Sequence, residues 1–228
     1  MADRPGGTAA RRLRVVPTTK KGPSKRLQQG AKSRDEILDA AMRMMSVRGF
    51  DGTSIADIAR ESGLPNSSIY WHFNSKAGIL AAVMERGAER FFADVAPQPL
   101  QPDDTPAVYL RRRVRESAEV FATHPEFWRL FVLLMLSNDN PDVTEIVQRV
   151  RDHGRGSLHT LVATAYSASG QEVALRVADA IADFALAGFD GTFLAMQTCP
   201  QRSVERLVDQ VAESLIHLAG RTLAESST

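Results

Sequence analysis

The chain has 228 residues, of which 43% are hydrophobic, so it can bury a core and is not a disordered polymer overall. A single cysteine, Cys199, excludes an internal disulfide framework and is expected to be a structural thiol. No run approaches the roughly 18 consecutive apolar residues of a membrane span, and the basic start lacks the apolar segment of a secretory signal. We therefore expect a cytoplasmic protein with no membrane partner.

The formal net charge of +1 is unevenly distributed. Residues 1–32 contain nine Lys or Arg and one Asp, which gives +8, so residues 33–228 carry −7. Because these 32 residues also hold scattered Gly and Pro and no sustained apolar pattern, they predict a disordered basic arm. Its role is open between a polycation that follows the phosphate backbone or minor groove of DNA and a solubilising tail.

The first predicted helix begins at Ser33, because Ser33 and Glu36 have the spacing of a capping box. Apolar residues then recur on one face of this helix until Gly49 ends it. We expect this helix to be structural.

Two short helices and a glycine turn are predicted between Thr53 and Lys76. Ser54 and Asp57 can form a capping box at the first of them. Gly63 suits the positive φ at the end of that helix, and Pro65 suits the first turn of the next. The spacing therefore predicts a helix-turn-helix with a turn of two or three residues.

The second short helix has an inner and an outer face. Ile69 and Phe73 are four residues apart and are predicted to face inward. At 100° per residue this turns one set of side chains outward and puts a second set on the flanks; the outward set is Ser67, Ser68 and Trp71, and the flanking set is Tyr70 and His72. A capping Ser75 and Lys76 then start the next helix, where a cation, a hydroxyl and free N–H groups favour a bound phosphate.

The run GLPNSSIYWHFNSKAGIL, preceded by Gly52 to Ala59 (GTSIADIA), resembles the DNA-binding domain of the TetR family of transcriptional repressors. The resemblance is specific from about residue 33 to residue 80, and a later stretch, HPEFWRLF, is also similar to many members. It implies an all-α homodimer of about nine helices, with an N-terminal DNA-binding domain and a C-terminal ligand-binding and dimerisation domain. The chain departs from the family at Ala56, where members often carry a basic residue that contacts DNA.

On this basis we predict contacts with a double-stranded DNA operator. Phosphate contacts are assigned to Tyr70, His72 and Lys76, and base contacts to Asn66, Ser67, Ser68 and Trp71, since Asn pairs with adenine and Ser serves either base. Further DNA contacts are assigned to Thr53 and Ser54.

The rest of the chain carries helical patterns only. A helix over 75–95 continues the apolar stripe, and four prolines between residues 97 and 106 form a loop. Further helices are predicted over about 107–122, 125–136, 141–168, 171–197 and 202–220. The predicted domains are an arm over 1–32, a DNA-binding domain over 33–80, a C-terminal domain over 81–220 and a tail over 221–228.

Two sites are predicted in the C-terminal domain. The last two helices are rich in small residues, which suits either an internal hairpin or a helical pair that meets its symmetry mate; the resemblance favours the dimer, near Ala182, Ala185 and Leu215. Aromatic and Met side chains suit either core packing or the wall of an apolar cavity for a small hydrophobic effector; the candidates are Phe121, Trp128, Phe131 and Met135.

No catalytic or cofactor motif is found in the sequence. His153 and His159 are six residues apart and Cys199 is distant, so no metal-ligand spacing is present, and no G-x-S-x-G elbow or phosphate loop occurs. We therefore predict no enzyme, no metal and no cofactor. The predicted function is an operator-binding, nucleoid-associated repressor that an effector releases. The alternative is a helical small-molecule enzyme or carrier whose N-terminal module serves protein contacts.

Overall fold

The computed structural model describes residues 25–96, 98–136, 140–198 and 204–225. Within these ranges the chain forms nine α-helices, one short 3-10 helix and no strand. The helices are α1 (Lys25–Arg48), α2 (Ile55–Ser62), α3 (Asn66–His72), α4 (Lys76–Asp94), α5 (Pro106–Thr123), α6 (Pro125–Leu136), α7 (Pro141–Ala165), α8 (Gln171–Thr198) and α9 (Val204–Glu225), with the 3-10 helix η1 (Ser167–Ser169) before α8. The predicted all-α class is confirmed.

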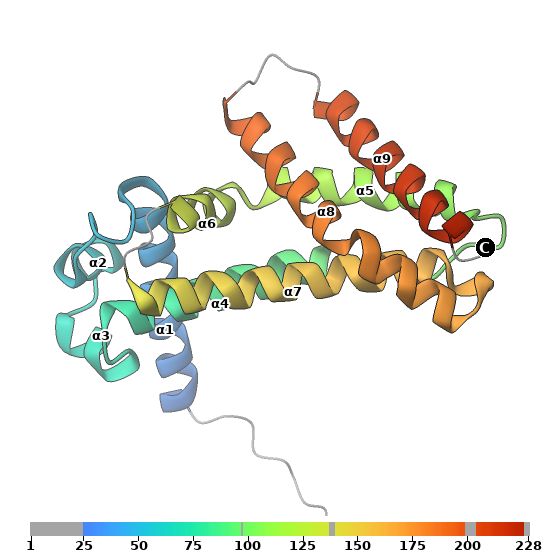
Figure 1. Ribbon diagram of the computed structural model, residues 1–228. Coiled ribbons are helices and arrows are strands. Elements are labelled where there is room, and N and C mark those ends of the chain that lie inside the picture. Colours follow the sequence, from blue (N-terminus) through green and yellow to red (C-terminus); the bar gives the residue numbers. More distant parts are fainter. Residues whose placement is uncertain (1–24, 97, 137–139, 199–203, 226–228) are drawn as a thin grey trace, which may run out of the picture.

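Helices α4 and α7 run along the length of the molecule, and α1 crosses them at one end (Figure 1). The three helices α1, α2 and α3 gather at one end, and α4 packs against α7 and runs from that end into the body. The hairpin of α8 and α9 lies at the other end, where α9 also packs on α5. A single apolar core runs through both ends, and α4 and α6 each pack on α1 at one end and on α7 in the body.

Most helix ends follow from the local sequence. Thr105 and Asn140 each cap a helix whose first residue is a proline, with Val108 N donating to Thr105 Oγ1 (3.3 Å) and Asp142 N donating to Asn140 Oδ1 (3.0 Å). Gly63 ends α2 with a φ of 72°, a conformation that favours glycine.

The predicted start of the first helix is wrong. Helix α1 begins at Lys25, so Ser33 lies inside it, and residues 25–32 of the predicted arm are helical. These residues (KRLQQGAK) are mostly good helix formers, and Lys32 adds an i,i+4 pair with Glu36 (3.7 Å). The remaining arm residues 1–24, Cys199 and residues 226–228 of the tail lie outside the described residues.

The C-terminal end of α4 is held by a buried arginine. The Arg113 side chain is only 3% exposed, and its Nη2 donates to the carbonyl oxygens of Val95 (2.9 Å) and Ala96 (2.8 Å). Its Nη1 pairs with Glu116. A cation that binds the last carbonyls of a helix satisfies orphan acceptors and opposes the negative end of the dipole. Arg113 therefore fixes α4 to α5.

No helix in the described ranges has the length and apolarity that crossing a lipid bilayer requires.

Candidate nucleic-acid interface and ligand cavity

Helices α2 and α3 form the predicted helix-turn-helix. The Ser54 hydroxyl accepts from Asp57 N (3.1 Å), while Ser54 N donates to Asp57 Oδ2 (3.1 Å), so the capping box is present. Hydrogen bonds from the Ser54 hydroxyl and backbone lower the pKa of Asp57 to about 2. The turn spans residues 63–65, and Pro65 precedes α3 as its N-cap rather than occupying its first turn.

The exposed face of α3 has the predicted orientation. Ile69 and Phe73 are buried, whereas the Trp71 side chain is 76% exposed and Tyr70 is 55% exposed. Asn66 and Ser67 are also exposed, and Ser68 is half-buried. This face presents short polar groups and an indole ring to any molecule that docks on it.

Thr53 and Ser54, which were predicted to contact DNA from the start of α2, form hydrogen bonds within the protein. The Thr53 side chain is 1% exposed, and its Oγ1 donates to the carbonyl oxygen of Gly49 (2.9 Å), which contradicts a side-chain contact with DNA. Ser54 is exposed but caps α2. Ser54 therefore caps α2, and the Thr53 hydroxyl binds the carbonyl that follows the last residue of α1.

Lys76 has an internal partner. Its Nζ donates to the carbonyl oxygen of Phe50 (2.9 Å) and lies 4.2 Å from the centroid of the Phe50 ring. These contacts compensate a cation at a helix N-terminus, so an external anion is not needed to explain Lys76.

We expect Lys76→Met to lower the stability of the fold by about 1–2 kcal/mol, because a charged hydrogen bond and a cation–π contact are lost. The salt dependence of DNA binding should stay that of the parent. Urea unfolding and DNA titrations at several salt concentrations measure the two effects. A shallower salt dependence with unchanged stability would restore Lys76 as a phosphate contact.

Residues at the start of α1 adjoin the α3 face, which the sequence did not indicate. A shallow groove on the surface is lined by Gln29, Gly30, Ser33, Ser67, Ser68, Trp71 and His72. A Cβ placed on Gly30 would be 3.9 Å from the Trp71 ring, and the Arg34 guanidinium lies 5.3 Å from the centroid of Phe73. Desolvation, and then the charge of Arg34, lower the pKa of His72 below its ordinary value. The lowered pKa favours the neutral imidazole of His72.

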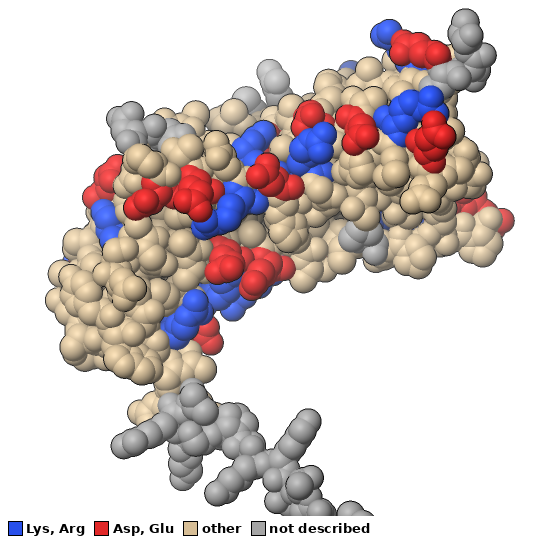
Figure 2. Space-filling view, turned by 60° about the horizontal axis from the view of Figure 1, so that its bottom comes forward, with Lys and Arg blue, Asp and Glu red and all other residues tan. Residues whose placement is uncertain are grey.

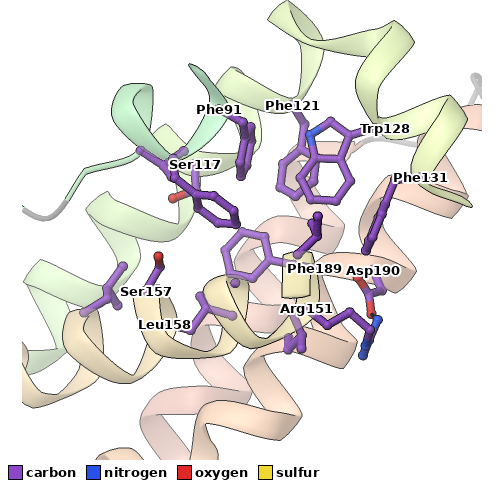
Figure 3. Close-up of a pocket in the computed structure, with 16 residues that line it drawn as sticks. Phe91, Ser117, Phe121, Trp128, Phe131, Arg151, Ser157, Leu158, Phe189 and Asp190 are labelled. Carbon is purple, nitrogen blue, oxygen red and sulfur yellow. Dashed lines mark hydrogen bonds and ion pairs between the residues drawn. The ribbon is translucent and has the colours of Figure 1, made fainter. Parts of the chain in front are cut away.

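An apolar cavity lies in the body between five helices (Figure 3). It is narrow, because the centre of a water molecule can occupy only about 50 Å³ of it. Its walls come from α4, α5, α6, α7 and α8, and are formed by Phe91, Phe92, Val95, Ser117, Phe121, Trp128, Phe131, Val150, Arg151, Gly154, Ser157, Leu158, Leu161, Leu186, Phe189 and Asp190. Three of the four predicted residues, Phe121, Trp128 and Phe131, line this cavity.

Met135 does not line the cavity. It lies next to the cavity's ionic edge instead, where its Sδ accepts from Arg151 Nη1 (3.4 Å). The same Nη1 donates to Asp190 Oδ2 (2.7 Å), and Figure 3 shows the two charged groups at one end of the aromatic cluster. The cavity therefore combines apolar walls with one ion pair.

Trp128 belongs to the core as well as to the cavity wall. It is 7% exposed and packs on five rings, with Phe121 (4.5 Å) and Phe91 (4.7 Å) nearest. Its Nε1 is buried without a hydrogen-bond partner among the described residues. Trp128 therefore packs in the core and also lines the cavity.

The residues predicted for the dimer interface are buried inside the monomer. Ala182 and Ala185 are 0% exposed and Leu215 is 1% exposed, so none of them can meet another chain. Ala182 and Ala185 of α8 and Leu215 of α9 are covered within the chain, as the competing interpretation of an internal hairpin expects. The exposed side of α8 instead carries apolar or small residues at helical spacing, namely Ala180, Phe184, Ala187, Gly191 and Leu194. We call these five residues the outward stripe of α8.

No cluster of three or more His, Cys, Asp or Glu with metal-binding geometry occurs among the residues described. His159 instead pairs with Asp179 (3.0 Å), and the exposed His153 ring stacks on Phe92 at 4.1 Å.

Comparison with known proteins supports the N-terminal assignment. Residues 37–83 match the family model described as bacterial regulatory proteins, tetR family. The chain is 36% identical over 58 residues to the transcriptional regulator AcrR of Shigella flexneri and 38% identical over 58 residues to TtgR of Pseudomonas putida. These segments cover 25% of this chain and 27% and 28% of the two relatives, so the chain matches about a quarter of their length.

The whole fold is also found in solved structures. A putative transcriptional regulator from Pseudomonas aeruginosa superposes with a TM-score of 0.67 at 17% identity, covering 85% of this chain and 94% of that one. One from Saccharomonospora viridis, in complex with choline, superposes with a TM-score of 0.62 at 22% identity, covering 82% and 97%. The family model, these relatives and the capped helix-turn-helix together show that residues 37–83 form a tetR-type module, and the solved structures show that most of the chain shares their fold.

Proposed function

We propose that the protein is a transcriptional regulator that binds duplex DNA through α3. The observation that supports this most directly is the exposed polar and aromatic face of α3, whose opposite, apolar face is buried against the rest of the helix-turn-helix domain. A recognition helix of this kind enters the major groove and reads base edges through short side chains. The relatives matched in this region are themselves named as HTH-type transcriptional regulators. Its action on DNA would place it in the cytoplasm.

Trp71 offers a direct test of this proposal. Trp71→Ala should lower affinity for the preferred DNA sequence by about 1–3 kcal/mol, while fold stability stays within about 0.5 kcal/mol because the side chain is 76% exposed. Operator binding by fluorescence anisotropy and unfolding in urea measure the two quantities.

Val47→Ala is the matched control, since Val47 is 71% exposed in the same domain but lies on the groove lined by α6 and α7 residues rather than at α3. If Trp71→Ala and Val47→Ala bound the operator equally well, α3 would not be the reading helix.

We further propose that the protein binds DNA as a homodimer through the outward stripe of α8. The exposed Phe184 and Leu194 lie on one face of α8, and the residues between them on that face, Ala187 and Gly191, are small. This face allows two α8 helices to approach closely across a twofold axis. A dimer would present two α3 helices to successive major grooves, about 34–36 Å apart, on a palindromic operator.

The cavity would then be the site of a largely hydrophobic effector that releases DNA. Phe91 and Phe92 of α4 line the cavity, and α4 continues from the DNA-binding end, so a ligand that widens the narrow cavity would displace α4. The shift of the DNA-binding equilibrium is limited by the ligand's differential affinity for the two states. Repression follows if the free protein blocks transcription at its operator.

A further inference from the structure

The apolar cavity has one charged end. Among the described residues that line it, only Arg151 of α7 and Asp190 of α8 carry a charge, and Arg151 Nη1 donates to Asp190 Oδ2 (2.7 Å). Ion pairs are common on the outer surface of the body, where Figure 2 shows basic and acidic side chains next to each other. This pair differs because it borders the cavity: the Asp190 side chain is only 23% exposed, against 74% for Asp183 in the neighbouring pair of Arg155 and Asp183.

Much of the hydrogen-bonding capacity of Arg151 is unused. A guanidinium has five N–H donors, and only those of Nη1 have partners in the described part of the chain, namely Asp190 and Met135. The donors on Nε and Nη2 lie on another edge of the same plane, and together they match the two oxygens of a carboxylate. Arg151 can therefore bind a second carboxylate while it keeps its bond to Asp190.

A second donor in the cavity wall also lacks an acceptor. The indole Nε1 of Trp128 is buried without a hydrogen-bond partner among the residues that the structure describes. An indole nitrogen can only donate, so an oxygen of a ligand is the kind of atom that would satisfy it. An ammonium group, by contrast, would have to share Asp190 with Arg151, which already balances its charge. The free groups of the cavity thus favour a ligand that carries acceptors.

The shape of the cavity limits the rest of the ligand. The wall is tight even at Gly154, where an added Cβ would lie 3.3 Å from Leu186 Cδ1 and 3.6 Å from Phe92 Cζ. Arg151 and Ser157, which both line the cavity, are six residues apart on α7, or about 9 Å along the helix axis. A slim molecule with one aromatic ring and a short chain suits these dimensions. Because ring faces carry partial negative charge, its carboxylate would lie at the Arg151 end rather than against them.

We propose that the ligand of this cavity is an aromatic monocarboxylate, whose carboxylate pairs with Nε and Nη2 of Arg151 while its ring packs among the aromatic side chains. This inference rests on the proposed effector site and names its ligand class. Arg151 is then the residue that selects an anionic compound, and Asp190 holds the guanidinium in place.

The test measures how the full-length protein binds one carbon skeleton with three different head groups. Isothermal titration calorimetry compares 3-phenylpropionate with 3-phenylpropanol and 3-phenylpropylammonium. Phenylacetate and 4-phenylbutyrate, each with its own alcohol and amine, vary the distance between the ring and the acid. The acid that binds most tightly should bind about tenfold or more tightly than its alcohol and its amine, because only the acid pairs with the free edge of Arg151.

Three variants locate the acid. Arg151→Gln should lower the affinity for the acid by about ten- to a hundredfold and leave that for the alcohol unchanged. Arg155→Gln is the matched control and should bind the acid like the parent, since Arg155 also joins α7 to α8, through Asp183 (2.7 Å), but neither residue lines the cavity. Asp190→Asn should bind the acid at least as tightly as the parent does, because it removes a negative charge beside the ligand.

The possible failures are distinguishable because binding is measured without DNA. If no acid binds more tightly than its alcohol, or if Arg151→Gln and Arg155→Gln bind the acid equally well, the inference is overturned and the effector site would take another class of ligand. If an amine binds most tightly and Asp190→Asn abolishes its binding, the cavity is a cation site and the inference also fails. If the acid binds through Arg151 but leaves operator binding unchanged in fluorescence anisotropy, the ligand class stands and the proposed release of DNA fails.

Discussion

Replacing Ala187 by glutamate is expected to split the homodimer and to abolish operator binding at concentrations where the parent binds fully. Ala187 lies at the middle of the outward stripe of α8, with Phe184 and Gly191 on either side. Near a twofold axis the two introduced carboxylates would face each other in an apolar seam, and an unpaired buried charge costs about 3–5 kcal/mol. That cost raises the dimer dissociation constant by about two to four orders of magnitude.

The variant should remain folded, because Ala187 is exposed in the monomer. Sedimentation velocity at micromolar concentration gives the assembly state, and far-UV circular dichroism gives the helix content. Ala168→Glu is the matched control, since Ala168 is an exposed alanine of η1 outside the outward stripe. An Ala187→Glu protein that sediments as an intact dimer would move the interface to another surface.

Glutamate at Ala185 should behave differently from glutamate at Ala187. Ala185 is 0% exposed within the chain, so a charge there is expected to unfold the monomer rather than to separate two folded subunits.

Helical periodicity could identify small-residue faces on α8, but it could not say which face the rest of the chain covers. That answer depends on how α7 and α9 pack on α8, which the local sequence does not encode.

The N-terminal module was more predictable because its signals are local. The capping box of Ser54 and Asp57, the positive φ of Gly63 and the four-residue spacing of Ile69 and Phe73 each act within a few residues, and all three are present. The role of Lys76 depends on Phe50, which is 26 residues away along the chain, so sequence spacing alone could not reveal it. The groove that Trp71 shares with Gln29 and Gly30 at the start of α1 joins residues that are similarly distant along the chain, and the sequence did not reveal it.

Trp128 should be a costly aromatic residue of the cavity to truncate. It contacts five rings and is 7% exposed, so Trp128→Ala is expected to lower the free energy of unfolding by about 3–5 kcal/mol. This is a large fraction of the roughly 5–15 kcal/mol that stabilises a typical domain. The ligand response of this variant therefore has to be measured at a temperature where unfolding curves show that it is still native.

Trp128→Phe separates packing from the polar edge of the indole. Phenylalanine keeps most ring contacts and removes Nε1, whose burial without a partner costs about 1–3 kcal/mol. That gain offsets part of the lost volume, so the net loss of stability should be about 1 kcal/mol or less. Equal losses for Trp128→Phe and Trp128→Ala in urea unfolding would show that the indole nitrogen is satisfied in solution.

The two Trp128 variants test two different properties of a ligand that binds in the cavity: the volume that it fills and its hydrogen bond to the indole nitrogen. A ligand that fills the enlarged cavity of Trp128→Ala should recover part of its stability, by about 2.7 kcal/mol at a hundredfold excess over the dissociation constant. A ligand with an acceptor that reaches Nε1 of the parent should bind Trp128→Phe more weakly, because that hydrogen bond is no longer available. Thermal shifts with neutral, anionic and cationic aromatic compounds test both effects. The same thermal shifts measured on Arg151→Gln and Asp190→Asn show which member of the ion pair recognises a charged compound. A compound that stabilises the parent and both Trp128 variants equally would bind outside this cavity, and its effect on DNA binding would need another site.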